Sequence, residues 1–196
     1  MIGRKKDLLR KVVYAIVFLV MLVSFIYLGN KYAGNSDVKE PTIVDFYNNV
    51  NKEKFEVISG SNFINKLKKG NHVIFIGSSK SEFSQKYIKE LEIILDETEL
   101  DKVYYYDIIN DKAQGNSNYY TIVKLLDGYL TTTDTSVNNL LSPSLYIVDN
   151  GKVKYYNIET CVMKNTDKVE DYWTLQKELE FKQEIISAIN KYYLNK

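Results

Sequence analysis

Hydrophobic residues change their spacing on either side of Gly77, and this change predicts a strand, a turn and a helix. Residues 72–76, His-Val-Ile-Phe-Ile, form a short apolar run typical of a buried strand. After a serine-rich turn, apolar residues recur at three- and four-residue spacing, which predicts an amphipathic helix over 81–96; they are Phe83, Tyr87, Ile88, Leu91, Ile94 and Leu95. The turn therefore lies at a helix N-terminus, where unpaired N–H groups favour a nucleophile or a bound anion.

Similar patterns predict the other elements of the domain. Further strands are expected at 54–59, 102–109, 145–149 and 152–158. Helices are expected at 63–68, with Ser61 or Asn62 as the cap, at 118–129, and once or twice within 167–196. The first elements follow the order βαβαβ, which favours an α/β domain whose parallel strands are covered by helices. The last two strands flank Asn150-Gly151, a turn preferred in antiparallel hairpins.

Residues 12–29 form an uncharged run of 18 residues. Such a run is just long enough to cross a bilayer core of about 30 Å as a helix. Basic residues dominate before the run, whereas charges nearly cancel after it, so the positive-inside rule places the N-terminus in the cytoplasm. A cleaved signal peptide and a buried soluble helix are the alternatives. The interpretation is a single-pass signal-anchor of the cell membrane.

The chain is therefore divided into four parts. They are a cytoplasmic basic tail at 1–11, a transmembrane helix at 12–29, a polar linker at 30–51 and an extracytoplasmic domain at 52–196. A threonine-rich loop at 131–135 within the domain is open to a binding or lid role, although a plain connecting loop is the simpler interpretation.

Composition excludes several kinds of site. A formal net charge of +1 with no basic stripe argues against a nucleic-acid partner. The single cysteine, Cys161, excludes an intrachain disulfide, a C-x-x-C pair and a multi-cysteine metal site. The single histidine, His72, excludes a multi-histidine site and begins a buried strand, where a structural role is expected. No metal and no cofactor are expected.

The domain resembles the thioredoxin fold over about 55–193. Val73 to Gly77 looks like the strand before the family's C-x-x-C motif, Ser81-Glu82-Phe83-Ser84 occupies the motif position, and Pro143 looks like the family's cis-proline. With the predicted anchor, the chain is similar to the membrane-bound thioredoxin-like proteins of Gram-positive bacteria, including the bacteriocin-accessory branch.

This resemblance implies where a partner would bind. In the family, extended substrates enter a groove between the motif turn and the proline loop. The corresponding candidates here are Gly77, Ser79, Lys80, Ser81, Glu82, Phe83, Ser142, Pro143 and Ser144. The partner implied is an extended peptide or another membrane protein.

Serine changes what this turn can do. A thioredoxin cysteine reacts as a thiolate, whereas a serine hydroxyl has no accessible ionised form and forms no disulfide, so Ser81 and Ser84 cannot perform thiol exchange. A hydrolase would need a base beside a serine, and no histidine is placed for that role. Structural roles are simpler, because Ser79 with Glu82 fits a capping box and Ser81 also fits a helix N-cap.

The sequence thus predicts a redox-inactive thioredoxin-like module that binds a partner outside the cell. One alternative is a thiol-disulfide oxidoreductase of secreted-peptide or bacteriocin maturation whose cysteines are lost or were replaced by design. A structural subunit of a membrane assembly is another.

Overall fold

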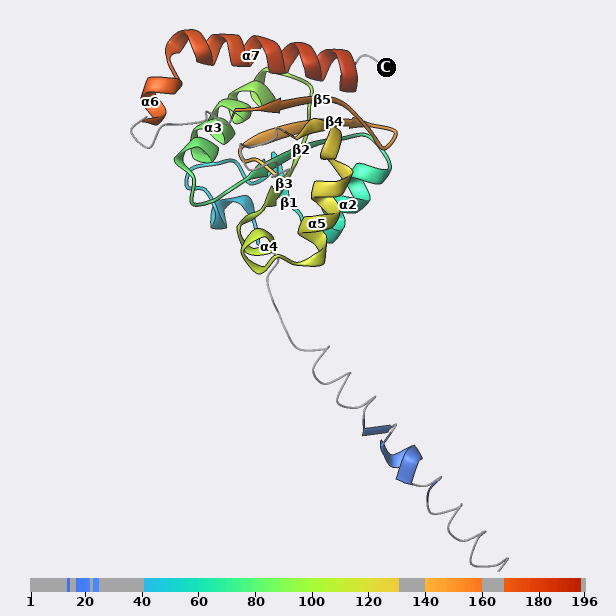
Figure 1. Ribbon diagram of the computed structural model, residues 1–196. Coiled ribbons are helices and arrows are strands. Elements are labelled where there is room, and N and C mark those ends of the chain that lie inside the picture. Colours follow the sequence, from blue (N-terminus) through green and yellow to red (C-terminus); the bar gives the residue numbers. More distant parts are fainter. Residues whose placement is uncertain are drawn as a thin grey trace, which may run out of the picture. The chain divides into compact units, whose positions relative to one another are not determined.

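The chain divides into two compact units, residues 1–40 and 41–196. The structure, a computed structural model, describes residues 14, 17–21, 23–24, 41–130, 140–159 and 168–194 (Figure 1). The threonine-rich loop and Cys161 lie outside the described residues, as do the basic tail, most of the predicted transmembrane run and the linker before residue 41.

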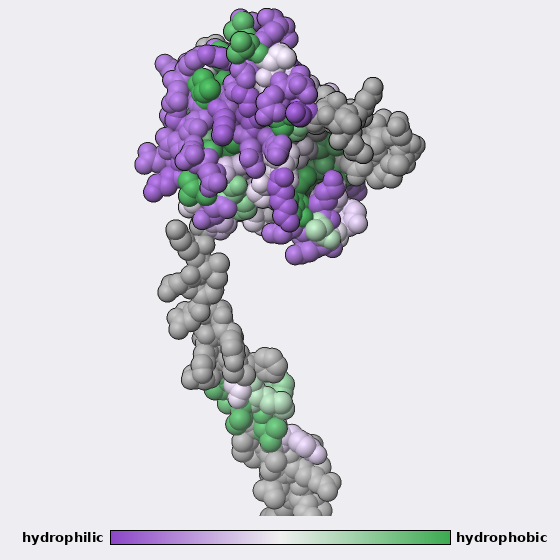
Figure 2. Space-filling model, turned by 90° about the vertical axis from the view of Figure 1, so that its left-hand side faces the viewer, coloured by the Kyte–Doolittle hydropathy of each residue, from purple (hydrophilic) through white to green (hydrophobic). Residues whose placement is uncertain are grey.

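The described residues of the first unit are helical and expose apolar side chains. Phe18 and Leu19 are each 65% exposed, and Figure 2 shows hydrophobic side chains gathered on this stretch. The hydroxyl of Ser24 donates to the carbonyl of Val20 at 2.8 Å. Within the part of the chain that the structure describes, none of the helices combines the length and apolar character that a membrane crossing needs.

The second unit is a mixed five-stranded sheet with helices on both faces (Figure 1). Its strands are β1 (Phe55–Val57), β2 (His72–Gly77), β3 (Val103–Asp107), β4 (Ser144–Asp149) and β5 (Lys152–Ile158). Its helices are α2 (Gly60–Lys68), α3 (Glu82–Glu97), α4 (Ile109–Gln114), α5 (Ser117–Leu125), α6 (Val169–Tyr172) and α7 (Leu175–Ile189). Short turns of helix are η1 (Ile43–Asp45), η2 (Asp127–Tyr129) and the π-helical η3 (Asn190–Leu194).

The strands lie in the order β1-β3-β2-β4-β5. Strands β1, β3 and β2 are parallel, which confirms the expectation drawn from the βαβαβ order. Strand β4 runs antiparallel to β2 and pairs with β5 as the predicted hairpin. Asn150 and Gly151 have φ angles of 51° and 71°, as the favoured two-residue turn requires.

Two hydrophobic clusters sandwich the sheet. Successive side chains of a strand point to opposite faces, so Val73 and Phe75 of β2 pack with α3 and α7, whereas Ile74 and Ile76 pack with α2 and α5. Every residue of both clusters lies between Ile43 and Leu194, so the second unit contains a complete core of its own.

Three helices differ from the sequence prediction. Helix α2 begins earlier than expected, because Ser59, rather than Ser61 or Asn62, caps it by accepting the Asn62 N–H at 3.3 Å. The predicted helix over 118–129 becomes α5 and then tightens into η2. Helix α4, which begins directly after β3, was not predicted.

Candidate functional site

The serine turn, residues 78–81, connects the C-terminal end of β2 to α3. Gly77 closes the strand in a space that a side chain would not fit, because a Cβ there would lie 2.6 Å from the Tyr47 hydroxyl and 2.7 Å from a ring carbon of Tyr105. The strand therefore ends against these rings, and the chain turns away toward the helix N-terminus.

Ser81 and Ser84 both hold the start of α3 in place. Ser81 is the N-cap, and its Oγ accepts the Ser84 N–H at 3.3 Å. The predicted capping box of Ser79 and Glu82 is wrong, because α3 begins one residue after Ser81 and the Ser79 N–H instead donates to Asp107 Oδ2 at 2.9 Å. The N-cap role that the sequence suggested for Ser81 is therefore confirmed.

Ser84 is fully buried and links the turn to the proline loop. Its Oγ accepts the Ser78 N–H at 3.1 Å and shares a second hydrogen bond of 3.1 Å with Ser142 Oγ. Ser142 precedes Pro143 through a cis peptide bond, as the resemblance implied. The structure thus brings together two serines that are 58 positions apart in the chain.

A buried chain of phenols continues from Ser84 beneath the turn. The Tyr47 hydroxyl contacts Ser84 and lies 3.1 Å from the Tyr105 hydroxyl. The Tyr105 hydroxyl also lies within hydrogen-bond distance of Asp107 Oδ2, to which it donates at 2.7 Å. Burial is the main cause that raises the pKa of both tyrosines, so both phenols stay protonated near neutral pH.

Asp107 joins this chain to the backbone on both sides. Besides Tyr105, its carboxylate accepts the N–H of Ser79 and, at 2.8 Å, the N–H of Ile109, which starts α4. One carboxylate at the end of β3 therefore fixes the serine turn, a phenol and the first turn of the next helix.

The groove candidates differ in how much surface they offer. Lys80 and Glu82 are exposed, and Ser79, Ser81, Phe83 and Ser142 are half-buried. Gly77, Pro143 and Ser144 are buried, and the Ser144 hydroxyl donates to the Leu141 carbonyl at 2.9 Å. The first six residues therefore contribute to the surface at this end of the sheet, whereas the last three lie beneath it.

A second polar network borders the same end of the sheet. The buried carboxylate of Glu159, which follows β5, accepts hydrogen bonds from Asn157, Tyr172 and Lys177. The Tyr172 ring packs against Phe83 with centroids 5.9 Å apart. This network therefore holds α6 beside the start of α3.

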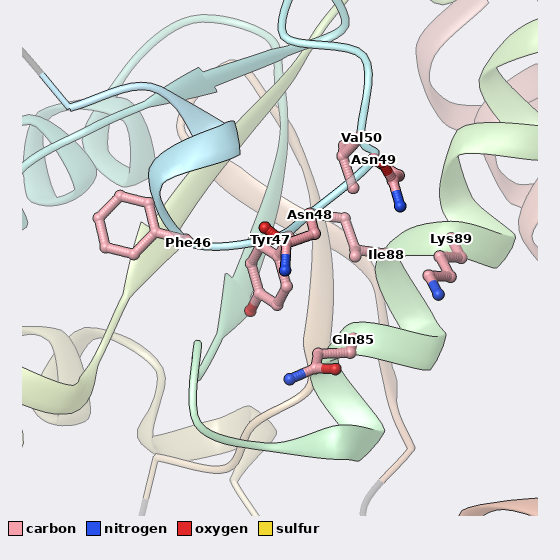
Figure 3. A pocket seen from close by; sticks show the side chains of 8 residues that line it. All are labelled: Phe46, Tyr47, Asn48, Asn49, Val50, Gln85, Ile88 and Lys89. Carbon is pink, nitrogen blue, oxygen red and sulfur yellow. The ribbon is translucent and has the colours of Figure 1, made fainter.

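A pocket of about 210 Å³ lies between residues 46–50 and α3 (Figure 3). The ring of Tyr47 lines it, together with Gln85 and Lys89 from the exposed side of α3. It adjoins the phenol chain, and no carboxylate, imidazole or thiol is among the side chains that line it.

The serine hydroxyl groups of this arrangement have no catalytic base hydrogen-bonded to them among the described residues. Among the described residues no imidazole or carboxylate hydrogen-bonds to Ser81 or Ser84, and His72 lies at the opposite end of β2. In the same part of the chain, no three His, Cys, Asp or Glu side chains gather as a metal site.

Sequence reasoning missed Tyr47, Tyr105 and Asp107. Alternation along β3 would have placed Tyr105 and Asp107 on one face. Their position beneath the turn additionally requires that β3 lie beside β2, which the parallel order implies. For Tyr47 the sequence contains no such signal, because its contact with Ser84 is purely tertiary.

Comparisons with known proteins give structural likeness only. No protein-family model matches the chain, and no curated protein does. Thioredoxin O2 of Arabidopsis thaliana, in its oxidized state, has 11% identity and a TM-score of 0.43, over 74% of this chain and 98% of that one. Thioredoxin O1 of the same plant, also oxidized, has 12% identity and a TM-score of 0.41, over 71% and 98%.

The finer resemblance to bacteriocin-accessory proteins stays a prediction, since no family model or curated relative supports it. The fold itself follows from the strand order, the parallel crossovers, the terminal hairpin and the helices on both faces. On these features the domain has an α/β thioredoxin-like fold.

Proposed function

We propose that the chain is a membrane-anchored, redox-inactive thioredoxin-like module that acts by binding a partner outside the cell. The observation that carries this proposal is the hydrogen bond between Ser84 and Ser142 beside the cis-proline. The turn and the proline loop meet as a groove requires, yet both motif positions hold hydroxyl groups that stabilise the local structure. Such a groove can bind a chain but cannot exchange a disulfide.

The proposed ligand is an extended peptide segment, either free or part of another membrane protein. A peptide that pairs with backbone groups beside Pro143 gains strand-like hydrogen bonds that need no thiol. Lys80 and Glu82 stand exposed at the rim and carry opposite charges, which would orient a ligand through its own charges. Phe83 and Tyr172 add a half-buried aromatic pair beside them.

Crosslinking tests the groove directly. A photoreactive amino acid at position 80 of the full chain should capture a partner in membranes of the source cell. The same group at Asn65, an exposed position on α2, is the matched control. Capture at both positions, or at neither, would contradict a groove at the serine turn.

The proposed anchor rests on the apolar run and on the exposed side chains of its described residues. Apolar groups that surround a helix need lipid or a protein partner to cover them. A serine that bonds back to its own helix, as Ser24 does, leaves no hydroxyl for solvent to satisfy. The full chain should resist extraction from membranes by alkaline carbonate, and protease added outside intact cells should remove residues 41–196; full release by carbonate would refute the anchor.

The oxidoreductase alternative has one supporting observation, the placement of Ser81 and Ser84 at the start of α3. A helix N-terminus lowers the pKa of a thiol and so favours the thiolate. The native domain should not reduce insulin disulfides. If Ser81→Cys/Ser84→Cys folds and gains this activity, the oxidoreductase ancestry is supported, whereas activity in the native domain would contradict redox inactivity.

A further inference from the structure

A cleft of about 460 Å³ lies at the end of the sheet away from the serine turn. Three lysines line it, Lys68 at the end of α2 and Lys152 and Lys154 at the start of β5. Leu67, Leu125 and Val153 give the cleft an apolar lining as well. This feature, called the lysine cleft below, plays no part in the groove proposed above.

Close backbone contact holds the two sides of the lysine cleft together. The Gly151 N–H donates to the Gly70 carbonyl at 3.2 Å, and a Cβ on Gly151 would lie 2.3 Å from the Lys68 carbonyl oxygen. On the third side, the Tyr129 hydroxyl donates to the Val153 carbonyl at 3.4 Å. The lysines therefore project from walls that the fold has fixed.

The three lysines are exposed and lack the partners that other lysines of the domain have. Five lysines elsewhere in the described domain form ion pairs with carboxylates. Among described residues, Lys68, Lys152 and Lys154 form none, and no acidic side chain lines the lysine cleft. Residues 41–196 hold more acidic than basic side chains, so this positive patch is a local feature.

We propose that the lysine cleft binds the headgroup region of an anionic phospholipid membrane. Ammonium groups attract lipid phosphates through charge alone, and their carbon chains lie along apolar surface. Leu125 lines the cleft and is 38% exposed, so the apolar part of a bound lipid would cover it. A free phosphate would leave that surface uncovered.

The proposed anchor supplies the membrane, and to that extent this inference rests on the proposed function. A domain tethered to a bilayer meets lipid headgroups at high effective concentration, so even weak attraction would set its orientation. The two proposals fail separately, because the anchor is tested by extraction of the full chain and the cleft by vesicle binding of residues 41–196, which contain a complete core.

Binding to lipid vesicles tests whether the lysine cleft contacts an anionic membrane. Residues 41–196 should co-sediment with vesicles of phosphatidylcholine and phosphatidylglycerol in a 3:1 ratio, and not with phosphatidylcholine alone. Each lysine near an anionic surface contributes about fivefold in affinity, so Lys68→Gln/Lys152→Gln/Lys154→Gln should bind about 100-fold more weakly. Raising the salt concentration should weaken the vesicle binding of the native domain. It should cause little further loss of binding in the triple variant.

A second triple variant removes the same charge elsewhere. Lys52, Lys112 and Lys168 are exposed and lie outside the cleft, and replacing them by glutamine should change affinity less than about twofold. Leu125→Asn keeps every lysine and should still weaken binding, because the exposed part of the apolar lining is lost. Thermal melts identify any variant that fails to fold.

Three results would overturn the proposal. An equal loss of vesicle affinity in both triple variants would show that only the net charge of the domain matters. An unchanged affinity in the variant that lacks the three cleft lysines would place membrane binding elsewhere. Full competition by millimolar glycerol 3-phosphate would identify a site for small soluble phosphates instead of a membrane surface.

Discussion

Gly77→Ala is expected to destabilise the domain strongly, whereas Gly128→Ala is expected to have little effect. A Cβ at position 77 would lie 2.6 Å from the Tyr47 hydroxyl, 2.7 Å from a ring carbon of Tyr105 and 3.0 Å from one of Phe75. All three rings are buried, so none can swing into solvent. Overpacking of a rigid core costs typically 1–3 kcal/mol, and three fixed neighbours argue for about 3 kcal/mol.

Gly128 is the matched control, because a Cβ there meets nothing within 4 Å. Urea unfolding of residues 41–196, followed by circular dichroism, gives both free energies of unfolding. A loss of about 3 kcal/mol lowers the Tm of a domain of this size by about 6–12 °C. Gly128→Ala should stay within about 0.5 kcal/mol of the native domain. Equal stability of the two variants would refute the reasoning that Gly77 is required by space.

Three further changes test the polar interior by the same unfolding measurement. Ser84→Ala removes a buried hydroxyl with two hydrogen bonds and should cost about 1–3 kcal/mol. Tyr87→Phe should cost a similar amount, about 1–3 kcal/mol, because the Asn157 oxygen that accepts its hydroxyl at 3.0 Å stays buried without that donor; a neutral effect of either change would contradict its role. Burial first, and Lys66 second, lower the pKa of His72 from 6.5, so the folded state binds fewer protons than the unfolded chain. Stability should therefore fall as the pH is lowered through 6.5, and less so in His72→Gln; an identical slope in both would contradict this assignment.

Local spacing predicted the elements that carry the site. The apolar run at 72–76 and the helical spacing after Gly77 correspond to β2 and α3 nearly residue for residue. The Asn150-Gly151 turn also behaves as its residue types suggest. These features depend on neighbours in sequence, so the pattern was sufficient.

Choices among equivalent residues could not be predicted in the same way. Residues 59–62 include three side chains able to cap a helix, and only the backbone of the finished fold selects Ser59. The same holds at the serine turn, where Ser79 has the capping-box spacing but its N–H is held by Asp107 from another strand. A tertiary hydrogen bond therefore distinguishes Ser79 from Ser81, the residue that caps the helix.

The hydrogen bonds of Ser84 explain how the serine turn and the proline loop are held together. In the observed network Ser84 accepts a backbone N–H, bonds Ser142 and contacts Tyr47, all of which need a strong donor and acceptor. A thiol is weak in both roles. The turn and the proline loop are thus joined by an interaction that a cysteine pair would supply poorly, and the phenols beneath extend it to Asp107. A hydroxyl at this position therefore contributes to the fold itself, because Ser84 holds the turn and the proline loop together without any thiol chemistry.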